Sequence, residues 1–158
     1  MSDSTLLLQQ TADRLAIMEA KAAYCRYADF LDLDGMLAVF TEDCEFRYGP
    51  GDEVIVGTQA IREWYRLEVE RTVASLHMVS NFEISFVSPD KAQSRCALHS
   101  WKRFVDKAQD RHRYVHYVEE WVRTDAGWRQ SRLEYQVIGE TGTDTARGLE
   151  HLRSTHAA

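Results

Sequence analysis

Apolar residues near the start of the chain recur every three or four positions, which is the spacing of one helix face. The same spacing continues into two carboxylates, so the complete stripe is Leu15, Met18, Ala22, Cys25, Asp29 and Asp32. Ile17, Tyr24 and Leu31 widen this face. The pattern predicts a helix from about Thr11 to about Leu33. Its last turns carry two acids on the side expected to be buried, where a carboxylate without a partner is costly.

Shorter elements follow this helix before the pattern changes. The Leu33-Asp34-Gly35 segment breaks the helix, and Met36 to Phe40 fits a short helix with Asp34 as its N-cap. Further along, the pattern predicts a strand at 44–48, a loop at 49–53, a short strand at 54–56 and a third helix that starts at Thr58.

Alternation of apolar and polar residues dominates the second half of the chain. Four alternating runs at 81–88, 92–105, 112–123 and 128–139 are separated by short polar turns. Long strands joined by short turns form an antiparallel meander. Three helices followed by such a meander predict one α+β domain over residues 1–140. Residues 141–158 have weak amphipathicity and are predicted to be a frayed tail.

The alternation contains one conflict, at the start of the strand-rich half. His77 and Val79 fall on one side of a regular strand, whereas Phe82, Ile84 and Phe86 fall on the other. A β-bulge between the two sets would bring them to the same face. Otherwise the aromatic set packs on the opposite face of the sheet, and the alternation leaves both alternatives open.

Charge and composition exclude several classes of partner. The 158-residue chain has a formal net charge of −6, whereas nucleic-acid binding needs a basic face. No run approaches the roughly 20 apolar residues of a membrane helix, and the N-terminus lacks the features of a signal peptide. Three scattered cysteines without a CxxC motif favour free thiols in the reducing cytoplasm. We therefore expect a cytoplasmic protein without nucleic-acid or membrane partners.

Motifs for cofactors and metals are also missing from the sequence. It contains no GxGxxG, P-loop or GxSxG pattern, and nothing places a base beside a cysteine. His112 and His116 have the spacing of a helical metal site, but in a strand they would lie roughly 13 Å apart. We therefore predict no cofactor and no metal.

Five segments together suggest a family: YADFLDLDGMLAVFTED, CEFRY, GTQAI, SLHMVSNFEISF and EEWVRTDAGWRQSRLEY. They resemble the SnoaL-like branch of the nuclear-transport-factor-2-like superfamily, over roughly residues 11–139. The resemblance implies a cone-shaped barrel, in which a curved, mixed, mostly antiparallel sheet wraps around three N-terminal helices. The superfamily includes isomerases, dehydratases, epoxide hydrolases and non-catalytic subunits, so the fold alone does not decide the function.

The resemblance also implies an active site. In its site residues the chain is most similar to scytalone dehydratase and hexachlorocyclohexane dehydrochlorinase, which have an Asp at the end of the first helix and a His on a later strand. Asp32 and His77 match this catalytic pair. Tyr48 matches a tyrosine that holds the substrate carbonyl through water. The second active-site His of the dehydratase falls near Lys102, where this chain departs from the pattern.

The chemistry of these residues is consistent with proton transfer. A carboxylate that accepts a hydrogen bond from one nitrogen of His77 would raise the basicity of the other, which makes the ring a competent general base. Four further residues are predicted to line the substrate pocket, namely Asp29, His116, Tyr24 and Trp64. For Asp29 a purely structural role, held by an arginine or a backbone amide, is the favoured alternative.

The leading functional hypothesis is a cofactor-free lyase or isomerase. His77 would remove a proton from a small, apolar, cyclic or aromatic substrate, followed by loss of water or halide or by a double-bond shift. Two alternatives are a non-catalytic partner similar to the β subunit of ring-hydroxylating dioxygenases and a polyketide-cyclase-like ligand-binding domain. The outer face of the sheet needs cover, so we expect a homodimer or homotrimer.

Overall fold

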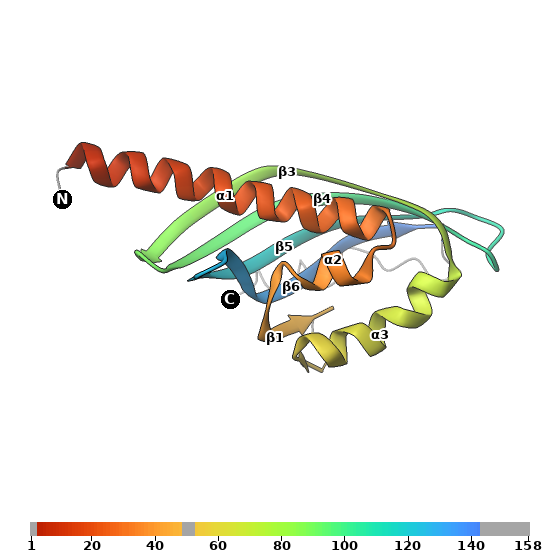
Figure 1. The fold of residues 1–158 in the computed structure, drawn as a ribbon. Helices are drawn as coiled ribbons and strands as arrows, with labels where there is room; N and C mark the ends of the chain where they lie inside the picture. Colours follow the sequence, from red (N-terminus) through yellow and green to blue (C-terminus); the bar gives the residue numbers. More distant parts are fainter. Residues whose placement is uncertain (1–2, 49–52, 143–158) are drawn as a thin grey trace.

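The computed structural model describes residues 3–48 and 53–142, and all but the first two residues of the predicted tail at 141–158 lie outside this range. Three helices pack on one side of a curved sheet (Figure 1). The helices are α1 (Asp3–Asp29), α2 (Leu33–Leu37) and α3 (Thr58–Arg71). The strands are β1 (Phe40–Arg47), β2 (Ile55–Val56), β3 (Thr72–Ser88), β4 (Lys91–Phe104), β5 (Arg111–Thr124) and β6 (Gly127–Thr141). The predicted α+β class is confirmed.

The six strands form one sheet in the order β2-β1-β6-β5-β4-β3. The four long strands β3 to β6 form the predicted antiparallel meander, and β1 pairs with β6 in parallel. The sheet is therefore mixed and mostly antiparallel. It curves without closing, since β2 and β3 remain as its two edges. None of the helices within the described ranges is long and apolar enough to cross a membrane.

A β-bulge in β3 resolves the conflict in the alternation. Between the pairs Ser80–Ala97 and Glu83–Arg95, β3 advances three residues while β4 advances two. Asn81 takes up the extra residue with φ of 56°, a left-handed conformation that asparagine tolerates better than most residues. The side chains before and after the bulge consequently share the face that packs against the helices.

The buried face of α1 differs from the predicted stripe. Leu15 is 56% exposed and Met18 is also exposed, so the predicted stripe is wrong at these positions. The residues that are buried in the helix are Asp13, Ile17, Lys21, Tyr24 and Cys25. Two of them are charged and meet polar partners on the sheet. Ile17, Tyr24 and Cys25 are buried as predicted, so the core-facing side is rotated from the apolar stripe because it includes charged residues that a count of apolar positions leaves out.

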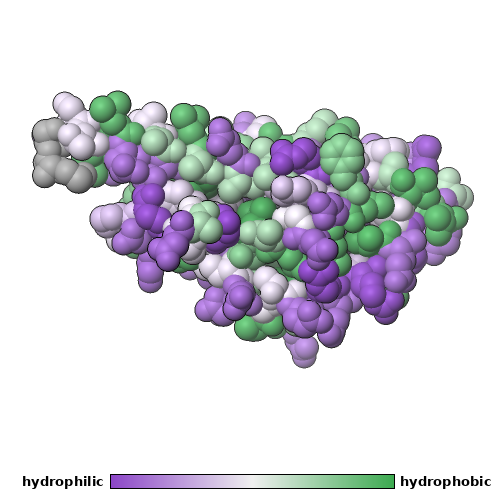
Figure 2. All heavy atoms as spheres, in the orientation of Figure 1, coloured by the Kyte–Doolittle hydropathy of each residue, from purple (hydrophilic) through white to green (hydrophobic). Residues whose placement is uncertain are grey.

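The first turns of α1 extend past the end of the sheet (Figure 1). This part carries Leu6, Leu7 and Leu8, which are all exposed. Hydrophobic side chains are visible there at the surface in Figure 2. The remainder of α1 lies across the sheet and reaches β3 at its C-terminal end.

The end of α1 is closed by a Schellman motif rather than by the predicted break after Leu33. The Asp32 N–H donates to the Tyr27 carbonyl at 2.9 Å, and Leu31 has φ of 58°. The helix therefore ends at Asp29, and Asp32 becomes the N-cap of α2, where its side chain accepts from the Gly35 N–H at 2.9 Å. The prediction that Asp34 caps the second helix was wrong.

Candidate active site

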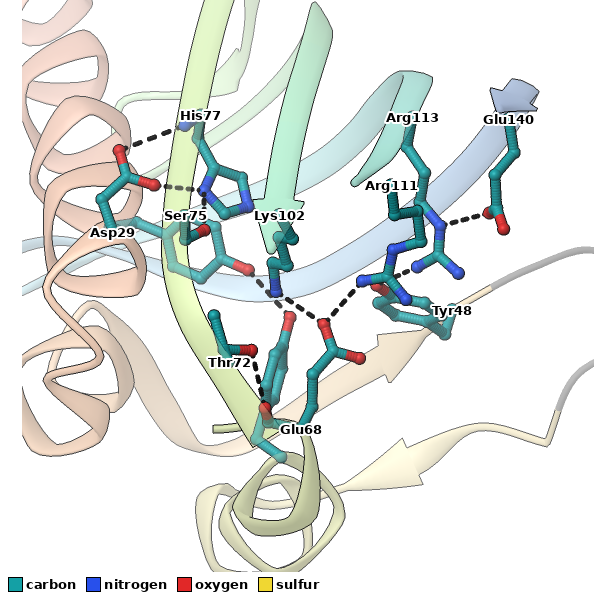
Figure 3. Close-up of polar contacts among 12 residues, drawn as sticks. Asp29, Tyr48, Glu68, Thr72, Ser75, His77, Lys102, Arg111, Arg113 and Glu140 are labelled. Carbon is teal, nitrogen blue, oxygen red and sulfur yellow. Dashed lines mark hydrogen bonds and ion pairs between the residues drawn. The ribbon is translucent and has the colours of Figure 1, made fainter. Parts of the chain in front are cut away.

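A carboxylate and an imidazole meet where the end of α1 lies against β3 (Figure 3). Oδ1 of Asp29 lies 2.6 Å from Nδ1 of His77, and Oδ2 of the same carboxylate accepts the His77 backbone N–H at 3.1 Å. Ser75 Oγ lies 3.5 Å from the same ring nitrogen. Two contacts to one residue fix both the position of the strand and the orientation of the ring.

The predicted pairing of His77 with Asp32 was therefore wrong, because Asp29 is the partner. Asp32 lies beyond the helix end and is exposed, with its carboxylate on the Gly35 amide. The predicted helix includes a turn in which the backbone of Leu31 is left-handed. The helix ends before this residue, so helical spacing does not predict where the Asp32 side chain points. Asp29 also accepts a backbone N–H, which is the contact expected for its structural alternative, while Asp32 serves as a helix cap.

The environment of His77 favours a neutral ring with one nitrogen available. Burial lowers the His77 pKa, the hydrogen bond that His77 donates to Asp29 opposes this shift, and the charge of Lys102 lowers the pKa further. The Asp29 carboxylate accepts a hydrogen bond from Nδ1–H of His77, a tautomer assigned from the hydrogen-bond network. Nε2 then carries the lone pair, and Figure 3 shows this nitrogen on the Lys102 side of the ring.

His77 lines a narrow cavity between α1, α2, α3 and the sheet. Its volume of about 20 Å³ has room for roughly one water molecule. The other lining residues include Tyr27, Leu31, Asp32, Met36, Tyr65, Glu68, Thr72 and Lys102. A second cavity of about 600 Å³ shares Glu68 with the first and is walled by Trp64, Phe104 and Arg111. A substrate larger than a water molecule can reach His77 only if side chains that line this cavity move.

Two charged residues, Glu68 and Lys102, line the narrow cavity beside His77, and Arg111 joins them from the larger cavity. Nζ of Lys102 lies 2.6 Å from Oε1 of Glu68, and Nη2 of Arg111 lies 2.9 Å from the same oxygen. Burial alone would raise the Glu68 pKa, but the two cations outweigh it and hold the pKa at about 2. Burial lowers the pKa of Lys102, and Glu68 opposes that shift.

Sequence reasoning missed Lys102 and Glu68 as site residues. One signal was available, because Lys102 shares its side of β4 with Leu98 and Ser100, which are both buried. A lysine on the buried side of an alternating strand needs a carboxylate partner. The sequence could not show that Glu68, on α3, is that partner.

Tyr48 lies in a different part of the molecule from the Asp29–His77 pair. Its hydroxyl accepts from Nη1 of Arg113 at 2.7 Å, its ring stacks on Tyr135 at 4.4 Å between centroids, and burial raises its pKa. Arg113 also donates to Glu140. Tyr48 lines a third cavity of about 510 Å³ that does not include His77. The structure does not bring the predicted third catalytic residue to the pair.

His116 faces away from the candidate site. It shares its side of β5 with Tyr114 and Val118, as predicted, but the opposite set, which includes Val115 and Tyr117, packs under the helices. His116 Nδ1 instead lies 3.0 Å from Arg95 Nη2. The prediction that it lines the cavity was therefore wrong, because alternation identifies two faces without saying which one is covered.

The two aromatic residues predicted to line the pocket have different outcomes. Tyr24 is 2% exposed and lies in the core, with its ring edge-on to Phe40 and Tyr117, so its predicted pocket position was wrong. Trp64 lines the cavity of about 600 Å³ and the cavity of about 510 Å³, but not the narrow cavity beside His77. Over 3–48 and 53–142 the structure shows no cluster of three or more His, Cys, Asp or Glu side chains that could hold a metal ion.

A family model for the SnoaL-like domain matches residues 9–134, which is most of the chain. This chain belongs to the SnoaL-like family. The site described above therefore lies in a SnoaL-like fold, on the side of the sheet that the helices cover. No curated protein sequence matches this SnoaL-like chain significantly.

Solved structures agree with the family. A candidate scytalone dehydratase of Novosphingobium aromaticivorans is 24% identical, with a TM-score of 0.82 over 89% of this chain and 95% of that chain. A candidate aromatic ring hydroxylase of the same organism is 29% identical, with a TM-score of 0.79 over 84% and 94%. A hexachlorocyclohexane dehydrochlorinase, LinA type 2, is 20% identical, with a TM-score of 0.77 over 86% and 92%. The SnoaL-like fold is thus shared with proteins named for elimination reactions.

Proposed function

We propose that this SnoaL-like protein is a cofactor-free lyase or isomerase in which His77 is the general base. The observation that carries the proposal is the 2.6 Å contact between Asp29 and His77 at the wall of a cavity. The two relatives named for dehydration and dehydrochlorination support an elimination. The proposal keeps the predicted role of His77 and gives the orienting role to Asp29.

In this proposal His77 Nε2 takes a proton from a carbon next to an electron-withdrawing group. The Asp29 carboxylate stabilises the imidazolium that forms and keeps Nδ1 protonated before and after the step. Proton transfer of this kind contributes typically about 10²–10⁴-fold to a rate. The products then depend on the substrate, which loses water or halide or takes the proton back at another carbon.

The experiment that tests this proposal uses small cyclic ketones, hydroxyketones and chlorinated cyclohexanes. Exchange of acidic C–H protons in D₂O and release of water or chloride would be followed by NMR and ion chromatography. His77→Gln should lower these rates about 10²–10⁴-fold while the protein stays folded. The matched control is His116→Gln, which changes the same side chain on the other face of the sheet. Equal rates for wild type and His77→Gln would contradict the proposal.

A second candidate function follows from the relative named as a candidate aromatic ring hydroxylase. In that case the chain would be a non-catalytic subunit that assembles with a larger, iron-bearing partner. Affinity purification from the native cell distinguishes the two functions, since only this second one requires an iron–sulfur subunit in the eluate. His77→Gln would then have no effect on the activity of the assembly.

The outer face of the sheet supports self-association. Leu76, Met78 and Tyr114 lie on this face and are each nearly half exposed, so an apolar surface is left uncovered. We propose that a second copy of the chain covers it, in a dimer or trimer. Sedimentation of wild type and of Met78→Asp tests this, because a charge at the interface should shift the protein towards monomer.

A further inference from the structure

We propose that Lys102 is a catalytic residue. Its ammonium donates a hydrogen bond to the substrate oxygen that becomes negatively charged when His77 removes a proton. It follows that the substrates are carbonyl compounds that react through an enolate. This inference rests on the proposed function and narrows its substrate class. It concerns a residue at which the chain departs from the pattern of the enzymes it resembles.

The first support is the relative position of the two side chains. His77 of β3 pairs with Ser100 of β4, and Lys102 pairs with Ser75, so both point to the helix-covered face from neighbouring strands. They line the same narrow cavity. Figure 3 shows the second ring nitrogen of His77 on the side of Lys102. In a ketone the carbonyl oxygen lies two bonds from the carbon that loses the proton, a span that groups on adjacent strands can bracket.

The second support is charge. Lys102 and Arg111 both contact the Oε1 atom of Glu68, so two cations share one carboxylate. The pKa of about 2 keeps Glu68 ionised, which favours a charged Lys102 despite burial. The group of Lys102, Arg111 and Glu68 therefore carries a net positive charge, and Lys102 brings its ammonium to the narrow cavity, where a partly dehydrated cation interacts strongly with an oxyanion.

The third support is hydrogen-bonding capacity. The ammonium of Lys102 has three N–H donors, and Glu68 is its only acceptor among the residues that the structure describes. Lys102 is 8% exposed, so water reaches the remaining donors poorly. A buried donor without a protein acceptor is ready to bind a ligand oxygen.

The step is balanced without any further reactant. The C–H bond breaks and its proton bonds to His77 Nε2, while its electron pair forms the C=C bond of an enolate. The carbonyl π pair becomes the charge on oxygen, which accepts a hydrogen bond from Lys102 Nζ. The enolate then re-forms the carbonyl and either expels a β-hydroxyl, which takes the proton from His77 and leaves as water, or takes that proton at another carbon.

The binding experiment uses a nitrophenol as the probe, because its ionised form resembles an enolate and absorbs visible light. Wild type should bind the ionised form about 10- to 100-fold more tightly than the neutral form. Lys102→Met should abolish this preference, and Lys102→Arg should keep it. The matched control is Lys91→Met, on the same strand but exposed. Should Lys102→Met not fold, Lys102→Gln, which can still donate to Glu68, serves instead.

The same variants are then compared in ketone proton exchange, so that the two proposals fail differently. Lys102→Met should slow exchange at least tenfold, whereas His77→Gln should slow exchange about 10²–10⁴-fold and keep the nitrophenolate preference. Unchanged preference and exchange in Lys102→Met would overturn the inference and leave the function of His77 intact. Normal exchange in His77→Gln would overturn the proposed function. If chloride displaces nitrophenolate and only chlorinated substrates react, the enolate inference is overturned.

Discussion

Two of the charged pairs that connect α1 to the sheet differ in what surrounds them. Lys21 Nζ lies 2.5 Å from Glu119 Oε1, and both side chains are 0% exposed. Two turns later Asp29 meets His77 at a comparable distance, but at the wall of a cavity. Both pairs join a side chain of the same helix to a largely buried side chain of the sheet, so burial and pairing alone do not distinguish a structural pair from one that can take part in chemistry.

Lys21 and Glu119 are surrounded by packed side chains, and neither of them lines the narrow cavity beside His77. Glu119 accepts from Ser94 at 2.5 Å and from Gln130 at 3.0 Å, while Nζ of Lys21 lies 3.3 Å from the centroid of the Tyr117 ring. In the Asp29–His77 pair, by contrast, Nε2 of the ring remains available beside the cavity. A buried pair can do chemistry only where one of its atoms reaches a space that a substrate can enter.

The largest expected effect is on stability, at the Lys21–Glu119 pair. Lys21→Met should lower the free energy of unfolding by about 3–5 kcal/mol, because Glu119 would stay buried without its cation. Urea denaturation measures this change. Lys21→Met combined with Glu119→Gln should recover most of the loss. If the double variant is as unstable as the sum of the single variants, the pair is not coupled.

The second largest expected effect is on activity, at the Asp29–His77 pair. Asp29→Asn should lower the rate of proton transfer about 100-fold or more, with little change in stability. The amide can accept from the His77 N–H or from Nδ1–H but not from both, so either the strand contact or the correct tautomer is lost. Steady-state kinetics and thermal denaturation separate the two outcomes. A loss of stability without a loss of activity would make this pair resemble Lys21–Glu119.

The pH dependence should also distinguish the pairs. Because the folded-state His77 pKa lies below the value of 6.5 expected when unfolded, the unfolded chain binds more protons as pH falls through this range. The contribution of His77 to stability is therefore complete above pH 6.5 and is lost below it. Activity should fall along an acid limb centred below pH 6.5, measured from the rate against pH. His77→Gln should remove the His77 contribution to the stability change.

The smallest expected effect is at Asp32, the acid that does not contact His77. Asp32→Ala should cost about 1 kcal/mol through loss of the α2 cap and should leave proton transfer within a few-fold of wild type. Asp32→Ser should restore the stability, since serine also caps helices. A loss of activity as large as that of Asp29→Asn would show that Asp32 takes part in the chemistry.

The sequence predicted the fold class and a contact between His77 and an acid of the first helix, but not which acid it is. Alternation over β3 to β6 is local information, and a long alternating run bounded by turns has few other structures available. The bulge near Asn81 was one of two alternatives in the pattern. The choice between Asp29 and Asp32 depended on the left-handed backbone of Leu31. A glycine is the usual sequence signal for such a helix end, and this position is a leucine.

The sequence by itself determined that an acid near the end of the first helix and His77 lie among buried residues. Only the tertiary structure decided which acid, which face of β5 is covered, and that Lys102 and Glu68 join the site. The physical reason is that period and alternation describe how side chains point relative to their own backbone. Contacts between α1, α3 and the sheet depend on how these elements pack, which no local pattern contains.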